Sequence, residues 1–370
     1  MSTERADHRP KWQDQKVRDI LTLEYGKALE NYRGSLGIYD VFGTNGKIGT
    51  TSVCLYDKPS LIIGRKGAYR GVHLATRPFF VIDTAFYIKK KVEDLDIQFL
   101  YNWFKCVDIN LMDSGSAIPS TSRDEVYELD IALPPPDEQK AIASVLTSLD
   151  DKIDLLHRQN KTLEAMAETL FRQWFVEEAQ EGWDEKPLSG IANFLNGLAC
   201  QKYPPTNELE KLPVLKIREL SSGISETADW VTSHVKPGYI VEAGDVIFAW
   251  SASLMVKVWD GEKCVLNQHL FKVTSDEFPK WFYLRWCKHH LAEFIAVAAN
   301  HATTMGHIKR GDLDAAMVLV PPPPVLETMS KQMQPLLDKQ IAIARQRKTL
   351  EKLRDTLLPK LMSGEVRVAY

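Results

Sequence analysis

The residues best suited to chemistry are hydrogen-bond donors set among glycines in the stretch IIGRKGAYRG, which begins at Ile62. Glycine lets a loop approach another backbone closely, and arginine, lysine and tyrosine can reach the base edges and phosphates of a nucleic acid. Two more polar turns, GTNGKIG and SGSAIPSTSR, lie on either side of this stretch. A solvated hairpin turn explains each residue equally well when it is taken singly, but the group as a whole favours recognition. The candidate contact residues here are Asn45, Lys47, Arg65, Lys66, Tyr69, Arg70, Ser116, Ser120, Thr121 and Arg123.

A second polar group follows later in the chain, in the stretches AWSASLMVK, NQH and HATTMGHIKR. Asparagine and glutamine suit adenine, and arginine and lysine suit guanine. The loop AWSASLMVK lacks the arginines of its earlier counterpart, so we expect the two groups to read different bases. The candidates are Trp250, Ser251, Ser253, Asn267, Gln268, His269, Thr303, Thr304, His307, Lys309 and Arg310.

Motifs for catalysis by this chain are missing. The proline runs ALPPPD and LVPPPPV lack the amide or acidic residue before and the aromatic residue after that an amino-methyltransferase uses to hold its target amine. The sequence contains no phosphate-binding loop of the G-x-x-x-x-G-K-[ST] type, and its histidines do not have metalloprotease spacing. We therefore predict no catalytic residue, no bound metal and no cofactor in this chain, which argues against a stand-alone methyltransferase.

Length and composition indicate a multidomain globular protein. The chain has 370 residues, of which 44% are hydrophobic and 26% charged, and its net charge is −3. A protein that grips polyanions through bulk charge would be basic, so any nucleic-acid contact must use local patches or the charges of partners. The five cysteines are scattered and no apolar stretch reaches membrane-spanning length, so we expect a cytoplasmic protein without a membrane span.

An internal repeat organises the chain. The stretch LPPPDEQKAIASVLTSLDDKIDLLHRQNKTLE from Leu133 matches VPPPPVLETMSKQMQPLLDKQIAIARQRKTLE from Val320 without a gap. Ten of the twenty positions from Asp151 to Leu170 are identical to those from Asp338 to Leu357. The segments before each stretch match more loosely, and both combine short β-branched runs, glycine turns and an aromatic helix. A repeat of this length indicates two copies of a whole unit.

Both repeated stretches carry apolar residues at alternating steps of four and three, which predicts two long helices paired along a heptad seam. The intervening domain makes an antiparallel pairing easier than a parallel one. Gln340, Arg347 and Arg354 weaken the second seam. The first seam comprises Ile142, Leu146, Leu149, Ile153, Leu156, Asn160, Leu163, Ala167, Leu170 and Trp174, and the second comprises Met329, Met333, Leu336, Gln340, Ile343, Arg347, Leu350, Arg354, Leu357 and Leu361.

At this level the sequence resembles the specificity subunit of type I restriction–modification systems, over essentially its whole length. The strongest markers are LPPPDEQKAIASVL, LDDKIDLLHRQNKTLEAMAETLFRQWF and the ending LRDTLLPKLMSGEVRV. The resemblance implies an α+β fold in which two pseudo-symmetric α/β target-recognition domains are separated by two long antiparallel coiled-coil helices. The expected divisions are a first recognition domain at 1–137, a first spacer helix at 138–180, a second recognition domain at 181–325, and a second spacer helix with its tail at 326–370.

The resemblance also implies function and partners. Each recognition domain would read one half of a split, asymmetric double-stranded DNA target, and the subunit itself would be non-catalytic. It would dock two adenine-N6 methyltransferase subunits and restriction subunits, which would carry S-adenosylmethionine, ATP and magnesium. Because the proline step occurs twice, we expect it to form part of this dock, through Asp137, Glu138 and Gln139. The second copy lacks this DEQ sequence, so its contact would differ. The alternative is a two-globule coiled-coil scaffold that holds protein partners without reading DNA.

Overall fold

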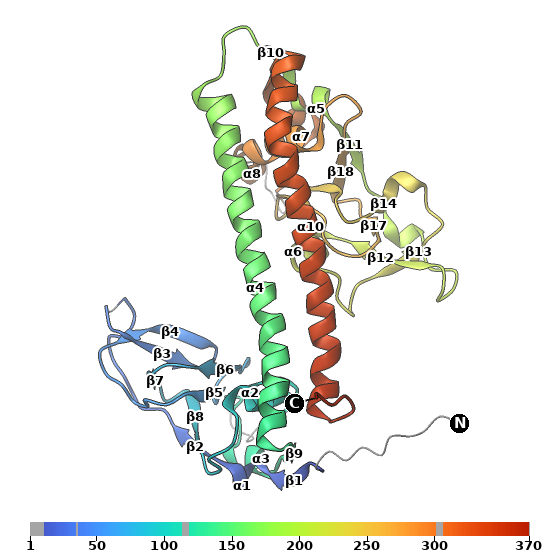
Figure 1. The fold of residues 1–370 in the computed structure, drawn as a ribbon. Coiled ribbons are helices and arrows are strands. Elements are labelled where there is room, and N and C mark those ends of the chain that lie inside the picture. Colours follow the sequence, from blue (N-terminus) through green and yellow to red (C-terminus); the bar gives the residue numbers. More distant parts are fainter. Residues whose placement is uncertain (1–10, 35, 113–117, 301–305, 370) are drawn as a thin grey trace. The chain divides into compact units, whose positions relative to one another are not determined.

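The structure is a computed structural model that describes residues 11–34, 36–112, 118–300 and 306–369 (Figure 1). It divides into two compact units. The first unit comprises Met1–Lys152 together with Glu351–Tyr370, and the second comprises Ile153–Leu350. Each unit contains one globular α/β part and a portion of each of two long helices.

The globular part of the first unit combines short strands with short helices. Its elements are β1 (Gln13–Lys16), α1 (Val17–Ile20), β2 (Leu21–Tyr25), β3 (Tyr39–Gly43), β4 (Gly46–Thr51), β5 (Ser60–Gly64), β6 (Val72–Ala75), β7 (Phe79–Val81), β8 (Ala85–Lys90), α2 (Ile97–Lys105), a 3-10 turn (Ile109–Leu111), α3 (Arg123–Glu128) and β9 (Asp130–Leu133). They form a four-stranded sheet of order β2-β8-β5-β6, a three-stranded sheet of order β4-β3-β7, and the antiparallel pair β1-β9.

Local sequence explains several of these elements. The stretch GTNG makes a tight hairpin between β3 and β4, in which Gly46 has a φ of +103° that glycine adopts without strain. Helix α2 is capped by Asp96, whose side chain accepts a hydrogen bond from the backbone N–H of Phe99. The aromatic side chains Phe99, Trp103 and Phe104 on this helix are buried in the core of the first unit. These aromatic residues therefore pack the helix against the sheet.

The second unit repeats this plan with more short helices. Its elements are β10 (Asp184–Pro187), α5 (Leu188–Ile191), β11 (Asn193–Asn196), a 3-10 turn (Cys200–Lys202), β12 (Lys211–Leu215), α6 (Ile217–Ser222), β13 (Trp230–Thr232), a 3-10 turn (Pro237–Tyr239), β14 (Ile240–Val241), β15 (Val246–Ala249), β16 (Met255–Val258), β17 (Cys264–Leu266), β18 (Leu270–Thr274), α7 (Lys280–His289), α8 (Leu291–Asn300), α9 (Arg310–Ala315) and β19 (Met317–Val320).

The two units share their topology. The sheet order β11-β18-β15-β16 corresponds strand by strand to β2-β8-β5-β6, and a second sheet has the order β13-β12-β17-β14. The terminal strand pairs also have the same register, since Gln13 faces Leu133 in the first and Asp184 faces Val320 in the second. This correspondence confirms the prediction of two pseudo-symmetric α/β domains.

The long helices are α4 (Pro136–Arg172), which continues as a π-helical turn (Gln173–Glu177), and α10 (Pro323–Met362). Each begins two or three residues earlier than the sequence-based limits of 138 and 326, because proline is well tolerated in the first turn of a helix. Helix α10 ends before Gly364, whose φ of +76° is the left-handed conformation that commonly ends a helix.

Helices α4 and α10 pack antiparallel along the predicted seam (Figure 1). Arg354 donates a hydrogen bond of 3.0 Å to Asp150 in the first unit, and Gln340 donates one of 2.9 Å to Glu164 in the second. All the seam positions named from the sequence are buried or half-buried. The antiparallel coiled-coil prediction is therefore confirmed.

Candidate nucleic-acid interface

The polar loops of the first unit meet at one edge of its four-stranded sheet, where β5 ends and β8 begins. The Gly67 N–H donates to the Pro119 carbonyl (3.0 Å), and the Thr121 N–H donates to the Arg65 carbonyl (2.8 Å). Lys66 and Ser120 form a β-bridge between the same two segments. We call residues 64–71 and 118–123, together with the hairpin turn at 43–47, the first loop junction.

The hairpin turn is tied into this junction through Thr44. The Thr44 hydroxyl lies 2.8 Å from the carbonyl oxygen of Lys66, and its backbone carbonyl accepts from the N–H of Gly71 at 3.1 Å. These bonds hold Asn45 and Lys47 exposed beside the loop. The Lys47 ammonium pairs with Asp40 at 2.6 Å. The structure thus brings together residues 43–47, 64–71 and 118–123, which the sequence suggested only as separate polar segments.

Two arginines of the junction lie against one aromatic ring. The guanidinium carbons of Arg65 and Arg123 lie 4.8 and 5.0 Å from the ring centroid of Tyr25. Such cation–π contacts restrain a guanidinium while leaving its N–H groups able to bind an anion. Tyr25 was missed by the sequence reasoning, because no local pattern connects β2 to loops forty or more residues away.

Arg70, which the sequence suggests as a DNA contact, is buried and makes structural contacts instead. Its side chain is only 4% exposed, and its guanidinium donates to the backbone carbonyls of Ile109, Asn110 and Met112 at 3.2, 3.0 and 2.8 Å. A guanidinium committed to buried carbonyls in this way cannot also reach a base edge. Arg70 instead fixes the conformation of the loop whose neighbouring residue, Tyr69, is 82% exposed.

Thr121 is also structural. It is buried, and its hydroxyl donates to the carbonyl of Gly64 at 2.9 Å, where it closes the junction from inside. Ser116 lies outside the described residues. The predicted contacts that remain accessible or half-accessible in the first junction are Asn45, Lys47, Arg65, Lys66, Tyr69, Ser120 and Arg123.

The second unit builds an equivalent junction where β15 ends and β18 begins. Ser251 and His307 form a β-bridge, the Ile308 N–H donates to the Trp250 carbonyl at 3.0 Å, and the Ala252 N–H donates to the Gly306 carbonyl at 2.8 Å. We call residues 250–253, 267–269 and 306–310 the second loop junction.

A hydrogen-bonded chain of polar side chains lies within the second junction. The Ser251 hydroxyl is 3.1 Å from Nδ1 of His269, and the Gln268 amide is 3.4 Å from Nε2 of the same ring. Trp250 lies over these groups, with its ring stacked on Phe271 and its Nε1–H donating to Asn196 at 3.1 Å. The half-buried Gln268 and His269 are therefore held in a fixed arrangement by their neighbours.

Two second-unit assignments are corrected in the same way as Arg70. Ser251 and Asn267 are buried, and the side-chain oxygen of Asn267 accepts from the backbone N–H of His269 at 3.4 Å. They shape the junction rather than face solvent. Thr303 and Thr304 lie outside the described residues. Accessible or half-accessible predicted contacts are Trp250, Ser253, Gln268, His269, His307, Lys309 and Arg310.

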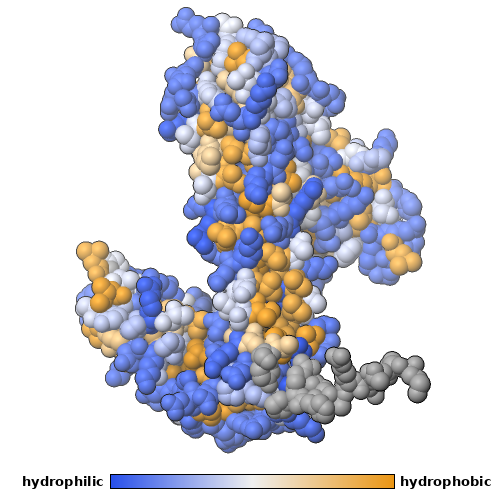
Figure 2. Space-filling view, viewed as in Figure 1, coloured by the Kyte–Doolittle hydropathy of each residue, from blue (hydrophilic) through white to orange (hydrophobic). Residues whose placement is uncertain are grey.

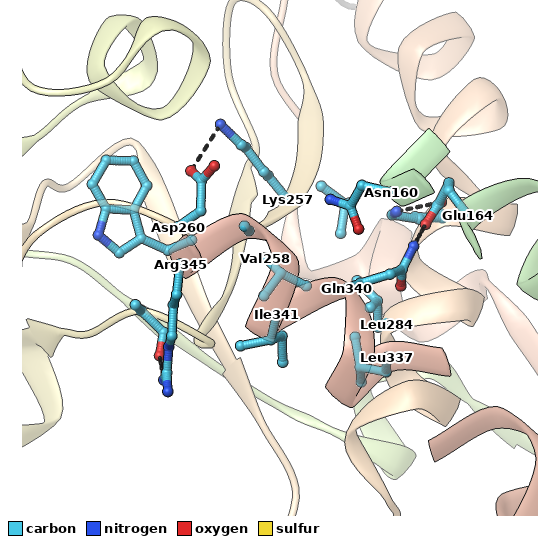
Figure 3. Close-up of a pocket in the computed structure, with 15 residues that line it drawn as sticks. Asn160, Glu164, Lys257, Val258, Asp260, Leu284, Leu337, Gln340, Ile341 and Arg345 are labelled. Carbon is cyan, nitrogen blue, oxygen red and sulfur yellow. Dashed lines mark hydrogen bonds and ion pairs between the residues drawn. The ribbon is translucent and has the colours of Figure 1, made fainter. Parts of the chain in front are cut away.

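Polar residues interrupt the helix seam where the second unit packs against it (Figure 3). Glu164 on α4 accepts two hydrogen bonds of 2.9 Å from Arg285, one of 2.6 Å from Lys288, and one of 2.9 Å from Gln340 on α10. Arg347 on α10 pairs with Asp260 at 2.8 Å. Gln340 and Arg347, which weaken the seam in the sequence, therefore make defined polar contacts.

The pKa of Glu164 reflects two opposing influences. Burial raises it, but the charges of Lys288 and Arg285 and their hydrogen bonds outweigh this effect and hold the pKa at about 2. Glu164 is therefore a carboxylate throughout the physiological pH range, and within the second unit it joins α4 to α7 and α10.

Comparisons with known proteins agree with this architecture. The family model of the type I restriction modification DNA specificity domain matches the chain twice, at residues 10–165 and 180–352. The chain belongs to this family.

Similar proteins carry the same name. The type I restriction enzyme MjaIX specificity subunit of Methanocaldococcus jannaschii is 28% identical over 300 residues, which cover 73% of this chain and 69% of that protein. The HindI specificity subunit of Haemophilus influenzae is 19% identical over 331 residues, which cover 68% and 72%. The crystal structure of the S subunit from M. genitalium superposes with a TM-score of 0.67 at 17% identity over 96% of this chain and 97% of that one, which shows a shared fold.

Two of the three residues that were predicted to contact partner subunits, Glu138 and Gln139, are buried within the first unit. Glu138 is fully buried, and its carboxylate accepts from Arg367 of the C-terminal segment and from Nε1 of Trp12. Gln139 is also buried, and it bonds the Pro134 carbonyl and the Asp96 N–H, each at 2.9 Å. Both side chains hold the first unit together, so Asp137 alone of the three is exposed for a partner.

The residues that the structure describes contain no group of three or more histidine, cysteine or acidic side chains placed to hold a metal ion. No helix within the same residues is both long enough and apolar enough to cross a membrane.

The ion pairs of Glu164 predict how stability responds to acid. A carboxyl pKa of about 2 lies below the value of about 4.3 expected in an unfolded chain, so this stabilisation is present above the unfolded pKa and is lost as pH falls from about 4.5 towards 2. We expect Glu164→Gln to cost about 2 kcal/mol at pH 7, below the usual 3–5 for a broken buried pair because solvent screens this half-exposed carboxylate.

The measurement is urea unfolding at pH 7, 5 and 3. The loss of stability between pH 5 and 3 should be smaller in Glu164→Gln than in the parent protein, because the titrating group is gone. Glu168→Gln is the matched control, since Glu168 lies one turn further along α4 and is exposed. Equal pH dependence of Glu164→Gln and the parent would contradict the assignment.

Proposed function

We propose that this chain is the DNA sequence-specificity subunit of a type I restriction–modification complex. It binds a bipartite, asymmetric double-stranded DNA target, with one half-site for each loop junction. It docks adenine-N6 methyltransferase subunits, two being the number that its pseudo-symmetry favours, and restriction subunits. The chain itself is non-catalytic, and S-adenosylmethionine, ATP and magnesium belong to the partner subunits.

The observation that carries this proposal is a junction of the same construction in each unit with different side chains. The first presents Arg65, Lys66 and Arg123 beside Tyr69. The second presents Gln268 and His269, with Lys309 and Arg310 exposed at its end. Base identity is read by the type and position of hydrogen-bonding groups. Two scaffolds alike in backbone but different in side chains are therefore suited to read two different half-sites, which makes the target asymmetric.

The net charge of the chain suggests that its partner subunits supply part of the DNA contact. A net charge of −3 provides no general attraction for DNA, and phosphate contacts supply most of the non-specific affinity of DNA-binding proteins. The junction cations can set register locally, while the remaining phosphate contacts would come from the methyltransferase subunits. We therefore expect tight, selective binding only in the assembled complex.

The long helices offer apolar surface for such partners. Figure 2 shows apolar side chains gathered over part of α4 and α10. Val145, Leu155, Met166 and Leu353 are large apolar residues on these helices that are exposed outside the seam. Helices from partner subunits could cover them and extend the pair into a bundle, which would remove this surface from water.

Substitution of one junction at a time tests the proposal. The chain would be expressed with the methyltransferase subunits encoded beside it, and methylated adenines would be mapped across the host genome. Asn45→Ala with Tyr69→Ala should relax one half-site, and Gln268→Ala with Arg310→Ala the other, with about 10- to 100-fold weaker discrimination for each lost contact, which corresponds to about 1–3 kcal/mol. The untouched half-site should keep its sequence.

The matched control is Lys58→Ala, at an exposed lysine just before β5 and thus at the opposite end of this strand from the junction. It should leave both half-sites unchanged. A shift assay with random-sequence duplex separates the scaffold alternative, since a scaffold would show no sequence-selective binding with or without methyltransferase subunits. If either pair of substitutions altered both half-sites equally, the assignment of one half-site to each unit would be wrong.

A further inference from the structure

A groove of about 850 Å³ lies beside the second proline step, within the second unit. It is bounded by the β10–β19 strand pair, the segment that leads into α7 and the first turns of α10. The repeat has an equivalent place in the first unit, between the β1–β9 pair, the start of α2 and the first turn of α4. The two places differ in a way that the sequence explains.

In the first unit the side chain of Gln139 fills this place. Its amide donates to the carbonyl of Pro134, and its oxygen accepts from the backbone N–H of Asp96, the residue that caps α2. Gln139 is buried between them. The first proline step is therefore closed by the chain itself.

In the second unit neither bond can form. Leu326 stands at the position of Gln139, three residues after the first helical proline, and Pro279 stands at the cap position of Asp96. Leucine has no amide, and proline has no backbone N–H to donate. The bridge is lost, and the space that it occupies in the first unit opens into the groove.

The groove combines an apolar floor with an acidic rim. Phe278, Pro279 and Leu326 contribute apolar side chains to the lining. Four exposed carboxylates stand around it, at Asp184, Asp276, Glu277 and Glu327. The single cation of the lining, Lys186, already bonds Glu277 at 3.2 Å and lies 5.2 Å from the centre of the Phe278 ring. The net charge of the lining is thus −3.

We propose that this groove docks a basic segment of a methyltransferase subunit, with lysine or arginine side chains on the acidic rim and apolar residues on the floor. This inference rests on the proposed function. The first proline step already shows how this protein receives an arginine, because Arg367 pairs with the carboxylate of Glu138 and lies 5.6 Å from the centre of the Trp12 ring. Since the first groove is closed, the two methyltransferase docks are unequal, and only the second uses this contact.

Substitutions that remove the negative charges of the rim test whether those charges contribute to binding of the methyltransferase subunit. The variant Asp184→Asn, Asp276→Asn, Glu277→Gln is expected to bind one of two methyltransferase subunits at least tenfold more weakly at 0.1 M salt, with the difference shrinking at 1 M salt as the charges are screened. Native mass spectrometry and titration of the full chain with purified methyltransferase subunit would measure both steps. All three positions are exposed, and thermal unfolding of the variant verifies its fold.

The matched control is Glu93→Gln with Asp94→Asn, which removes the equivalent exposed carboxylates before α2 in the first unit. It should leave both binding steps unchanged. Equal effects of the two variants, or none from either, would overturn the proposal.

A photoreactive benzoylphenylalanine in place of Glu327 identifies the occupant. Crosslinking to a lysine- or arginine-bearing segment of the methyltransferase supports the proposal. Crosslinking to an acidic or uncharged segment, to DNA, to this chain alone, or to nothing in the assembled complex overturns it. Genome mapping of methylated half-sites tests DNA reading independently, so a failed dock and a failed recognition function would be told apart.

Discussion

Replacing Arg367 with alanine is expected to lower the free energy of unfolding by about 3–5 kcal/mol, the cost of stranding a buried charge. Arg367 donates two hydrogen bonds to the carboxylate of Glu138, which is 0% exposed. Without the guanidinium, the donor to this carboxylate that remains among the described residues is Nε1–H of Trp12, at 3.2 Å. The buried carboxylate would then lack most of its hydrogen-bond donors, and this loss opposes folding.

Denaturant unfolding of three variants separates this mechanism from simple loss of packing. Glu138→Gln should cost less than Arg367→Ala, because the arginine can turn to solvent whereas the carboxylate cannot. The double variant Arg367→Ala, Glu138→Gln should recover part of the loss, since it removes the stranded charge. Lys360→Ala is the control, at a half-exposed cation near the same end of α10. Additive losses in the double variant would contradict a buried ion pair.

This pair changes how the docking role of the first proline step can be tested. Alanine at Glu138 or Gln139 would weaken the first unit itself, so reduced assembly would not identify a partner contact. Asp137 is free of this difficulty because its side chain is 78% exposed. Asp137→Ala, with unfolding measured beside assembly, is the informative substitution there.

The two long helices and the two-fold repeat of the chain were predictable because periodic sequence patterns specify them. A seven-residue repeat requires a helix long enough to use it, and its recurrence after a fixed interval requires a second such helix. The polar residues of the seam have polar partners on the facing helix. Arg354 faces Asp150, and Gln340 faces Glu164. These pairs could not be assigned from the sequence, because the register of the two helices was not known.

The roles of individual loop residues were not predictable in the same way. Lys66 and Arg70 lie in one glycine-rich stretch with the same local signal, yet Arg70 is buried because carbonyls near Ile109 turn toward it. Glu138 likewise has the local sequence of an exposed acidic residue in the first turn of a helix. It is buried because it pairs with Arg367, which lies 229 residues away in the sequence. Burial depends on contacts distant in sequence, which composition and spacing do not encode.

The proposed recognition function gives the helix pair a consequence for DNA spacing. Asp150–Arg354 and Glu164–Gln340 are separated by fourteen residues on each helix, which is two heptads. Asp150–Leu156 on α4 and Lys348–Arg354 on α10 are therefore facing segments of one heptad each. Deleting both keeps the seam in phase, and removes Asp150 and Arg354 together so that neither is left without the other.

We expect this double deletion to contract the DNA spacer while preserving both half-site sequences. Seven residues shorten each helix by about 10 Å at 1.5 Å per residue, which is close to three base pairs at 3.4 Å each. The polar anchors of the second unit on the helices, Glu164 and Arg347, stay in place. If the half-sites cannot follow the accompanying rotation around the DNA axis, binding is lost instead.

Mapping of methylated adenines in cells that express the deletion variant with its methyltransferase subunits measures the spacer directly. Deleting Asp150–Leu156 alone is the control, because it shifts α4 against α10 by one heptad and should abolish assembly or methylation. An insertion of one heptad in both helices should lengthen the spacer by a similar amount, since the argument depends only on helix length. A double-deletion variant that assembles and still methylates the original site with its original spacer would show that the helices do not set the distance between half-sites.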